Sequence, residues 1–134
     1  MKNNQTILFM TILFLGAKFA YGQPSVDAVQ AGFEIIYNRQ LGNCVTCHLV
    51  DHGEKKPSQQ LEKQGNFGPN LQGVGKKYSR EQLLQWVTDA RKIHPDTLMP
   101  PYGSLEGITI PNQQKTMLNP EQIQLVVDAL ITLN

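Results

Sequence analysis

The chain has 134 residues, with 12 Lys and Arg against 11 Asp and Glu, and 40% of its residues are hydrophobic. This length and composition predict one small domain with a single core and argue against two separate domains. The near balance of charges leaves no strong positive field to hold phosphate backbones, so we expect no nucleic-acid partner.

Residues 1–22 have the pattern of an export signal, which leaves residues 23–134 as the mature domain. An apolar run at residues 7–17 ends before Lys18, and the tripeptide Ala-Tyr-Gly then provides the small-residue spacing of a cleavage site. The alternative is an uncleaved membrane anchor, but a bilayer requires about 20 apolar residues. We therefore expect an exported protein without a membrane anchor, in a compartment that oxidises free thiols.

The first predicted helix begins near Ser25, a favourable N-cap residue, and runs to about Arg39. Its expected buried side carries Val26, Val29, Phe33 and Ile36. Gly32 lies within this helix, where glycine costs about 1 kcal/mol relative to alanine if the position is exposed. We therefore expect a second helix to cross closely at Gly32.

Both cysteines of the chain follow this helix, in the sequence Cys44-Val45-Thr46-Cys47-His48. The pattern C-x-x-C-H is the attachment signal for a c-type haem. If residues 44–48 form a helical turn, positions three and four apart share one face, so all three side chains can address the same flat group. Two thioether bonds would then hold the macrocycle, and His48 would bind the iron.

Two other uses of these side chains remain open. A C-x-x-C pair can shuttle disulfides, usually within a strand-rich βαβ frame that is not predicted here. A structural zinc site would need two further ligands, for which His52 and His94 are the candidates. Haem attachment is favoured over both because the motif is complete and lies on an exported chain.

About twenty residues further on, the chain reads Gly68-Pro69-Asn70-Leu71. Pro69 has a free carbonyl and no N–H. A metal-binding histidine usually donates its second ring nitrogen to such an acceptor, so we expect the Pro69 carbonyl to accept from His48. An ordinary turn is the alternative.

The second predicted helix begins at Ser79, which forms a capping-box pattern with Gln82, and is expected to stop at His94-Pro95. Its expected inner face carries Leu83, Trp86, Val87 and Ala90. Polar loops are predicted at residues 49–66 and 103–116.

Met99 lies in the sequence Thr-Leu-Met-Pro-Pro-Tyr-Gly, where two prolines stiffen the backbone. A thioether is a soft iron ligand that raises the reduction potential when it is paired with histidine. We therefore expect Met99 to be the second axial ligand. Its rivals are Met117, which we expect to pack beneath the last helix, and the histidines His52 and His94.

The third predicted helix begins at Asn119-Pro120 and presents one apolar face, made of Ile123, Val126, Val127, Leu130 and Ile131. No strand pattern is evident. The expected fold is all-α, with three to four short helices around one covalently bound haem. For Phe67, Tyr78, Trp86 and Tyr102 we expect ordinary core packing, with shielding of the haem edge or hydrogen bonds to its propionates as the alternative.

Taken together, these motifs resemble the class I cytochromes c. The residues around Cys44, the run Gly65-Asn66-Phe67-Gly68-Pro69, the Met99 loop and the final helix follow the same order. More narrowly, Arg39, Gly42-Asn43 and the sequence Met-Pro-Pro-Tyr-Gly are similar to the SoxX subunit of the sulfur-oxidising SoxAX cytochrome. Residues 104–117 form a longer link than expected for this family.

The resemblance implies a role and a set of site residues. Cys44 and Cys47 would attach haem c, and His48 and Met99 would be its axial ligands. The protein would be the electron-accepting partner of a SoxA-like cytochrome in the periplasm. Their complex would join thiosulfate to a cysteine of a SoxYZ-like carrier, and the electrons would pass to a soluble cytochrome c.

Iron with two firmly held ligands has no open position for a substrate, so we expect electron transfer and not catalysis by this chain itself. Two further interpretations remain open. One is a free-standing class I cytochrome c that shuttles electrons for another dehydrogenase or a terminal oxidase. The other is a haem enzyme such as a peroxidase, in which Met99 would dissociate from the iron.

Overall fold

The computed structural model describes residues 22–51, 53, 64–109 and 115–134. The predicted export signal, apart from Gly22, lies outside the described residues, as does His52. The described part of the chain is helical and contains no strand, which confirms the all-α prediction. Its α-helices are α1 (Val26–Tyr37), α2 (Val74–Lys77), α3 (Arg80–Asp89) and α4 (Pro120–Leu130), and it has two 3-10 turns, η1 (Cys44–Thr46) and η3 (Ala90–Lys92).

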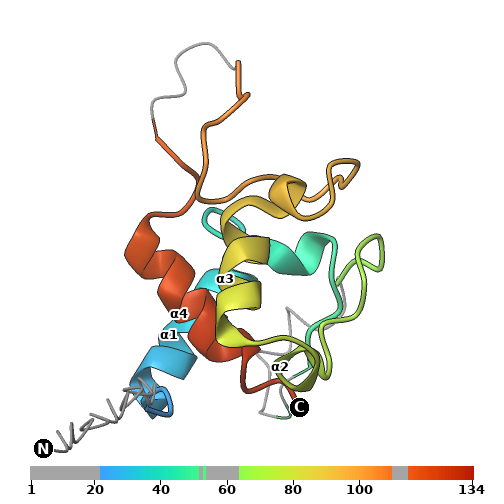
Figure 1. Cartoon of the computed structure of the whole chain (residues 1–134). Helices are drawn as coiled ribbons and strands as arrows, with labels where there is room; N and C mark the ends of the chain where they lie inside the picture. Colours follow the sequence, from blue (N-terminus) through green and yellow to red (C-terminus); the bar gives the residue numbers. More distant parts are fainter. Residues whose placement is uncertain (1–21, 52, 54–63, 110–114) are drawn as a thin grey trace, which may run out of the picture.

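The first and last long helices, α1 and α4, cross in close contact (Figure 1). Gly32 lies at the crossing. A Cβ atom there would be 2.0 Å from the carbonyl oxygen of Leu125 and 2.8 Å from the Cβ atom of Ala129. No side chain fits at this position, so the structure confirms the close helix approach predicted from Gly32.

The three predicted helix starts are confirmed by their caps. Ser25 accepts a hydrogen bond from the amide of Ala28 at 3.1 Å. Ser79 and Asn119 each form a capping box with the glutamine three residues later. These caps satisfy amide groups that would otherwise have no partner within the helix.

Two predicted helix ends were wrong. The first helix ends at Tyr37 and not at Arg39, and Val26, expected on its buried side, is 83% exposed. The helix α3 ends at Asp89 and not at His94. Asp89 leaves the helical conformation, with φ −159°, and its carboxylate accepts from the amide of Arg91, which starts the 3-10 turn η3.

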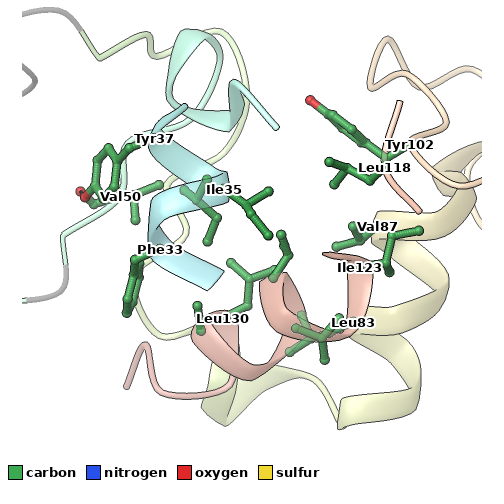
Figure 2. Close-up of a cluster of buried hydrophobic side chains, with 14 of the residues drawn as sticks. Phe33, Ile35, Tyr37, Val50, Leu83, Val87, Tyr102, Leu118, Ile123 and Leu130 are labelled. Atoms are coloured by element: carbon green, nitrogen blue, oxygen red, sulfur yellow. Dashed lines mark hydrogen bonds between the residues drawn. The ribbon is translucent and has the colours of Figure 1, made fainter. Parts of the chain in front are cut away.

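The hydrophobic core lies where α1, α3 and α4 meet (Figure 2). Ile36, Val126 and Val127 are among its fully buried side chains. The segment before α4 closes one end of the core through Leu118, which lies beside Tyr102. This packing leaves a cavity that is lined by α3, by α4 and by the loop segments before α2 and after η3.

Within the described residues, no helix combines the length and the apolar character that crossing a membrane requires.

Candidate cofactor-binding site

The first wall of the cavity is the segment that carries both cysteines. After α1 the chain turns sharply, with the amide of Gly42 bonded to the Ile35 carbonyl at 3.2 Å and Asn43 in the left-handed region at φ 49°. The turn η1 follows, and the amide of His48 bonds to the Cys44 carbonyl at 2.9 Å. This winding brings Cys44, Cys47 and His48 to the same cavity.

His48 is held by the segment around Pro69. Its Nδ1 lies 2.7 Å from the Pro69 carbonyl oxygen, to which an Nδ1–H donates. That tautomer leaves Nε2 without a proton, which is the form that binds a metal. Gly68 permits this contact, because a Cβ atom there would lie 2.5 Å from Cε1 of His48.

A short ladder of backbone bonds fastens this segment to the cysteine segment. The amide of Gly65 donates to the Val45 carbonyl at 2.8 Å, and the amide of Gly68 donates to the Cys47 carbonyl at 2.7 Å. Beyond them, the side chain of Gln64 accepts from the amide of Val50 and donates to its carbonyl. The sequence does not predict this role for Gln64, which is one of many polar residues in the predicted loop at residues 49–66.

Met99 lies on another wall of the same cavity. It is half-buried and packs against the hydrophobic core, and its amide donates to the hydroxyl of Thr97 at 3.2 Å. The loop continues through Pro100 and Pro101 to Gly103, whose amide donates to the Thr88 carbonyl of α3 at 2.9 Å. The loop that bears Met99 is thereby fastened to a core helix.

An ion pair between the buried Asp89 and the partly exposed Arg91 secures the chain just after this loop. Asp89 is 3% exposed and forms two hydrogen bonds of 2.8 Å with the Arg91 guanidinium group, which also donates to the Glu106 carbonyl at 2.8 Å. The bond from Arg91 and a further bond from Ser104 lower the pKa of Asp89 to about 2, against the opposing effect of burial. Sequence reasoning missed this pair, because an Asp near a helix end ordinarily lies in solvent.

The cavity has a volume of about 690 Å³ and is lined mainly by apolar side chains. Leu83, Val87, Leu118, Val126 and Leu130 connect it directly to the hydrophobic core. A volume in this range is typical of pockets that hold a small molecule or a cofactor, which measure about 300–1,000 Å³.

All four aromatic residues singled out in the sequence line the cavity. Tyr102 is buried in the core as expected, and Tyr78 and Trp86 are half-buried with ring centroids 6.3 Å apart. Phe67 is 72% exposed, so the expected core packing was wrong for this residue. It follows the exposed Asn66 in a polar segment and lines the cavity.

The rivals of Met99 differ in their positions. Met117 is 41% exposed and does not line the cavity, so the prediction that it packs beneath the last helix was wrong. His94 lines the cavity but is exposed, and its amide donates to the Ala90 carbonyl at 2.9 Å. His52 lies outside the described residues.

The state of the cysteines bears on the alternative of a thiol redox pair. Both thiols are free, and burial raises the pKa of Cys44 to about 11. A redox-active thiol needs a depressed pKa, because the thiolate is the nucleophile. This environment disfavours thiol exchange at Cys44. Among the residues that the structure describes, no group of three or more His, Cys, Asp and Glu side chains could hold a metal ion.

The residues that line the cavity fit a haem group. The donor set combines an imidazole with a fixed tautomer, a soft thioether and two cysteine sulfurs, and the remaining wall is largely apolar. These are the ligand types by which c-type cytochromes hold haem iron.

Comparison with known proteins finds similarity among solved structures. No family model and no curated relative matches the chain. Among solved structures, a chain of SoxXA from P. pantotrophus is similar to it, with a TM-score of 0.66 and 29% sequence identity over 78% of this chain and 80% of that chain. Together with the all-α architecture and the C-x-x-C-H motif, this similarity supports a SoxX-like cytochrome with the class I cytochrome c fold.

Proposed function

We propose that the chain is a monohaem c-type cytochrome that serves as the electron-accepting, SoxX-like subunit of a SoxAX-type complex. The observation that carries this proposal is the cavity, because Cys44, Cys47 and His48 line it together with Met99. The similarity to SoxXA supports the choice of complex.

In this proposal each site residue has one task. Cys44 and Cys47 would attach haem c through thioether bonds, and His48 and Met99 would bind its iron. The Pro69 carbonyl, 2.7 Å from Nδ1 of His48, keeps the imidazole in the ligating tautomer. The bound haem supplies a one-electron iron couple.

The surrounding residues favour electron transfer over catalysis. The Met99 loop is fastened to α3 at Thr88, and His48 is fastened at Pro69, so both side chains that would bind the iron are restrained. If both side chains bound the iron, no coordination position would be left for a substrate. The sulfur chemistry therefore belongs to the partner, and this chain is a non-catalytic subunit.

The proposed partners follow from the same role. A SoxA-like cytochrome subunit would form the heterodimer, and a SoxYZ-like carrier would present the cysteine to which thiosulfate is joined. Forming that S–S bond from a thiol and thiosulfate releases two electrons and one proton. The chain would accept the electrons one at a time and pass each to a soluble cytochrome c. Residues 1–22 would direct export to the periplasm and be cleaved.

The test is a pull-down of the tagged chain from the periplasm, with haem staining on a denaturing gel and mass spectrometry. We expect a mature chain that begins near residue 23, carries one covalent haem and brings down a second, larger c-type cytochrome. The same chain with Cys44→Ala and Cys47→Ala is the control, and it should carry no stain.

Two outcomes would contradict the proposal. Recovery of the haem protein only as a monomer would favour a free-standing electron shuttle, because a stable subunit needs a larger interface than a transient carrier. A high-spin spectrum with immediate binding of cyanide would indicate an open iron position and hence a haem enzyme.

A further inference from the structure

The loop of residues 93–102, which bears Met99, begins and ends beside the same end of α3. It follows η3 directly, and at its far end the amide of Gly103 donates to the Thr88 carbonyl at 2.9 Å. A Cβ atom at Gly103 would lie 3.1 Å from Cγ2 of Thr88, so the returning chain is in close contact with α3. The base of the loop is therefore narrow and is closed against this helix.

Arg91 joins both sides of this base. Its Nε and Nη2 atoms donate to the two oxygens of the Asp89 carboxylate, each at 2.8 Å. The same Nη2 donates to the Glu106 carbonyl, on the returning side, at 2.8 Å. Asp89 is 3% exposed, so its carboxylate is fixed within the protein and sets the direction of the guanidinium group. Arg91 thus links the end of α3 to the backbone that follows the loop.

The bonds of Arg91 are the strongest of these links across the base. The bond from Gly103 to Thr88 joins two neutral groups, and a hydrogen bond from a charged donor contributes about twice as much. Lys92 also pairs with the Glu106 carboxylate, but both partners are exposed, and exposed pairs contribute little.

The link lies outside the cavity. Asp89, Arg91 and Glu106 do not line the cavity of about 690 Å³. A cofactor bound there would therefore leave these hydrogen bonds in place.

We propose that Arg91 is a positioning residue for Met99: by joining Asp89 to the Glu106 carbonyl, it holds closed the base of the loop that presents Met99 to the cavity. This inference rests on the proposed function, in which Met99 would bind the haem iron. An open base gives the loop more conformations, and only some of them would place the thioether at the iron. Arg91 therefore raises the fraction of molecules in which Met99 is in place.

The test is the variant Arg91→Lys in the haem-bearing protein. Lysine keeps a positive charge beside the buried Asp89 but lacks the planar fork that binds both carboxylate oxygens and the Glu106 carbonyl together. Added imidazole competes with Met99 for the iron, and the loss of the sulfur-to-iron absorption band reports the displacement. We expect the apparent Kd for imidazole to fall by about tenfold, the factor that corresponds to losing one hydrogen bond from a charged donor.

Arg80→Lys is the matched control, with the same substitution at the other end of α3. Arg80 pairs with Asp128 and donates to Gln124 at 3.0 Å, both on α4, and it does not line the cavity. This variant should lower the unfolding midpoint without changing the Kd for imidazole. Equal Kd values in the wild type and Arg91→Lys would overturn the inference, as would an equal fall of the Kd in Arg91→Lys and Arg80→Lys.

Lys92→Gln separates the link from the charge near Glu106. It removes the neighbouring exposed pair and leaves the bonds of Arg91 in place. We expect its Kd for imidazole to stay within about twofold of the wild type, because exposed pairs contribute little. A fall as large as that in Arg91→Lys would overturn the inference.

Heating gives a second measurement on the same variants. In Arg91→Lys the loop should open while the helices persist, because local opening requires less free energy than unfolding of the core. The interval between the loss of the sulfur-to-iron band and the loss of helical circular dichroism should therefore be wider than in the wild type. An unchanged interval would overturn the inference.

Different results overturn the inference and the proposed function. A wild-type chain whose mass equals the bare polypeptide would overturn the proposed function and the inference with it. A haem-bearing chain with the sulfur-to-iron band, in which Arg91→Lys behaves as Arg80→Lys does, would overturn the inference alone.

Discussion

At the scale of single residues, the chemistry of the site depends on a few side chains. A single contact or the surrounding burial sets the chemical state of each. His48 gains its tautomer from one carbonyl, that of Pro69 at 2.7 Å. Cys44 lies in a buried environment that raises its pKa to about 11, so it is a poor nucleophile in solution chemistry. Met99 stands half-buried in a loop, with no acid–base chemistry of its own.

The variant Met99→Ala tests the second axial ligand. We expect it to keep the covalent haem but to lose the sulfur-to-iron absorption in the oxidised state and to lower the reduction potential, because a thioether ligand raises that potential. Spectroscopy and a redox titration measure both effects. Met117→Ala is the control, since Met117 is 41% exposed and does not line the cavity. An unchanged spectrum in Met99→Ala would exclude Met99 as a ligand.

At the scale of helices and loops, the contacts that position the site join elements far apart in the sequence. The closely crossed pair α1 and α4 forms the base of the core, and α3 holds the Met99 loop through Thr88 and Asp89. The position of Met99 therefore depends on how α3 ends.

Gly32→Ala tests the helix crossing. The new Cβ atom would meet the Leu125 carbonyl oxygen at 2.0 Å, so we expect the free energy of unfolding to fall by about 1–3 kcal/mol, as is usual for overpacked positions. This sign is opposite to the gain of about 1 kcal/mol that alanine gives at an exposed helix position. Urea unfolding measures the change. The control is Gln30→Ala, on the exposed side of α1, whose free energy of unfolding should stay within about 0.5 kcal/mol of that of the wild type. A stabilised Gly32→Ala variant would refute the close crossing.

Asp89→Asn tests the ion pair that closes α3. Its loss should lower the free energy of unfolding by about 2 kcal/mol at neutral pH, the value of a buried hydrogen bond to a charged group. The control Glu34→Gln, on the exposed face of α1, should have little effect.

The pH dependence of this contribution has a defined sign. The pKa of Asp89 is lowered to about 2 in the folded protein, against about 3.9 in an unfolded chain. The stabilisation is therefore complete above about pH 4 and is lost as the pH falls through about 2. Unfolding at pH 7 and at pH 3 should show a smaller difference between the wild type and Asp89→Asn at the lower pH. A difference that grows in acid would contradict the assignment.

At the scale of the whole molecule, the cavity and the core are continuous. The cavity of about 690 Å³ shares Leu83, Val87 and Val126 with the hydrophobic core. A domain of this length buries little apolar surface on folding, so a buried macrocycle would supply much of the buried apolar area.

The double variant Cys44→Ser/Cys47→Ser tests this dependence. Without covalent attachment we expect a largely unfolded chain with weak helical circular dichroism. Without the macrocycle, the apolar side chains that line the cavity lose their packing partner on one side, which weakens the core that they share. Native-like helix content and cooperative unfolding in the haem-free variant would contradict the prediction.

Much of the fold could be predicted from local sequence patterns. The caps at Ser25, Ser79 and Asn119 involve residues within three positions of each other, so the sequence alone locates the helix starts. The end of α3 could not be predicted from the sequence, because Asp89 leaves the helix to bind Arg91, which in turn donates to the Glu106 carbonyl. The exposure of Val26 and Met117 likewise depends on which neighbours pack against them.

By itself, the sequence determined the helical class, the helix starts, the need for a close crossing at Gly32 and the side chains suited to hold a haem. These properties depend on residue type and short spacing. Only the tertiary structure decided that Met99 shares a cavity with His48 and that Asp89 closes α3. The shared cavity depends on how distant segments of the backbone are brought together, and the end of α3 depends on the bond from Arg91 to Glu106. The packing of the whole chain therefore decides both.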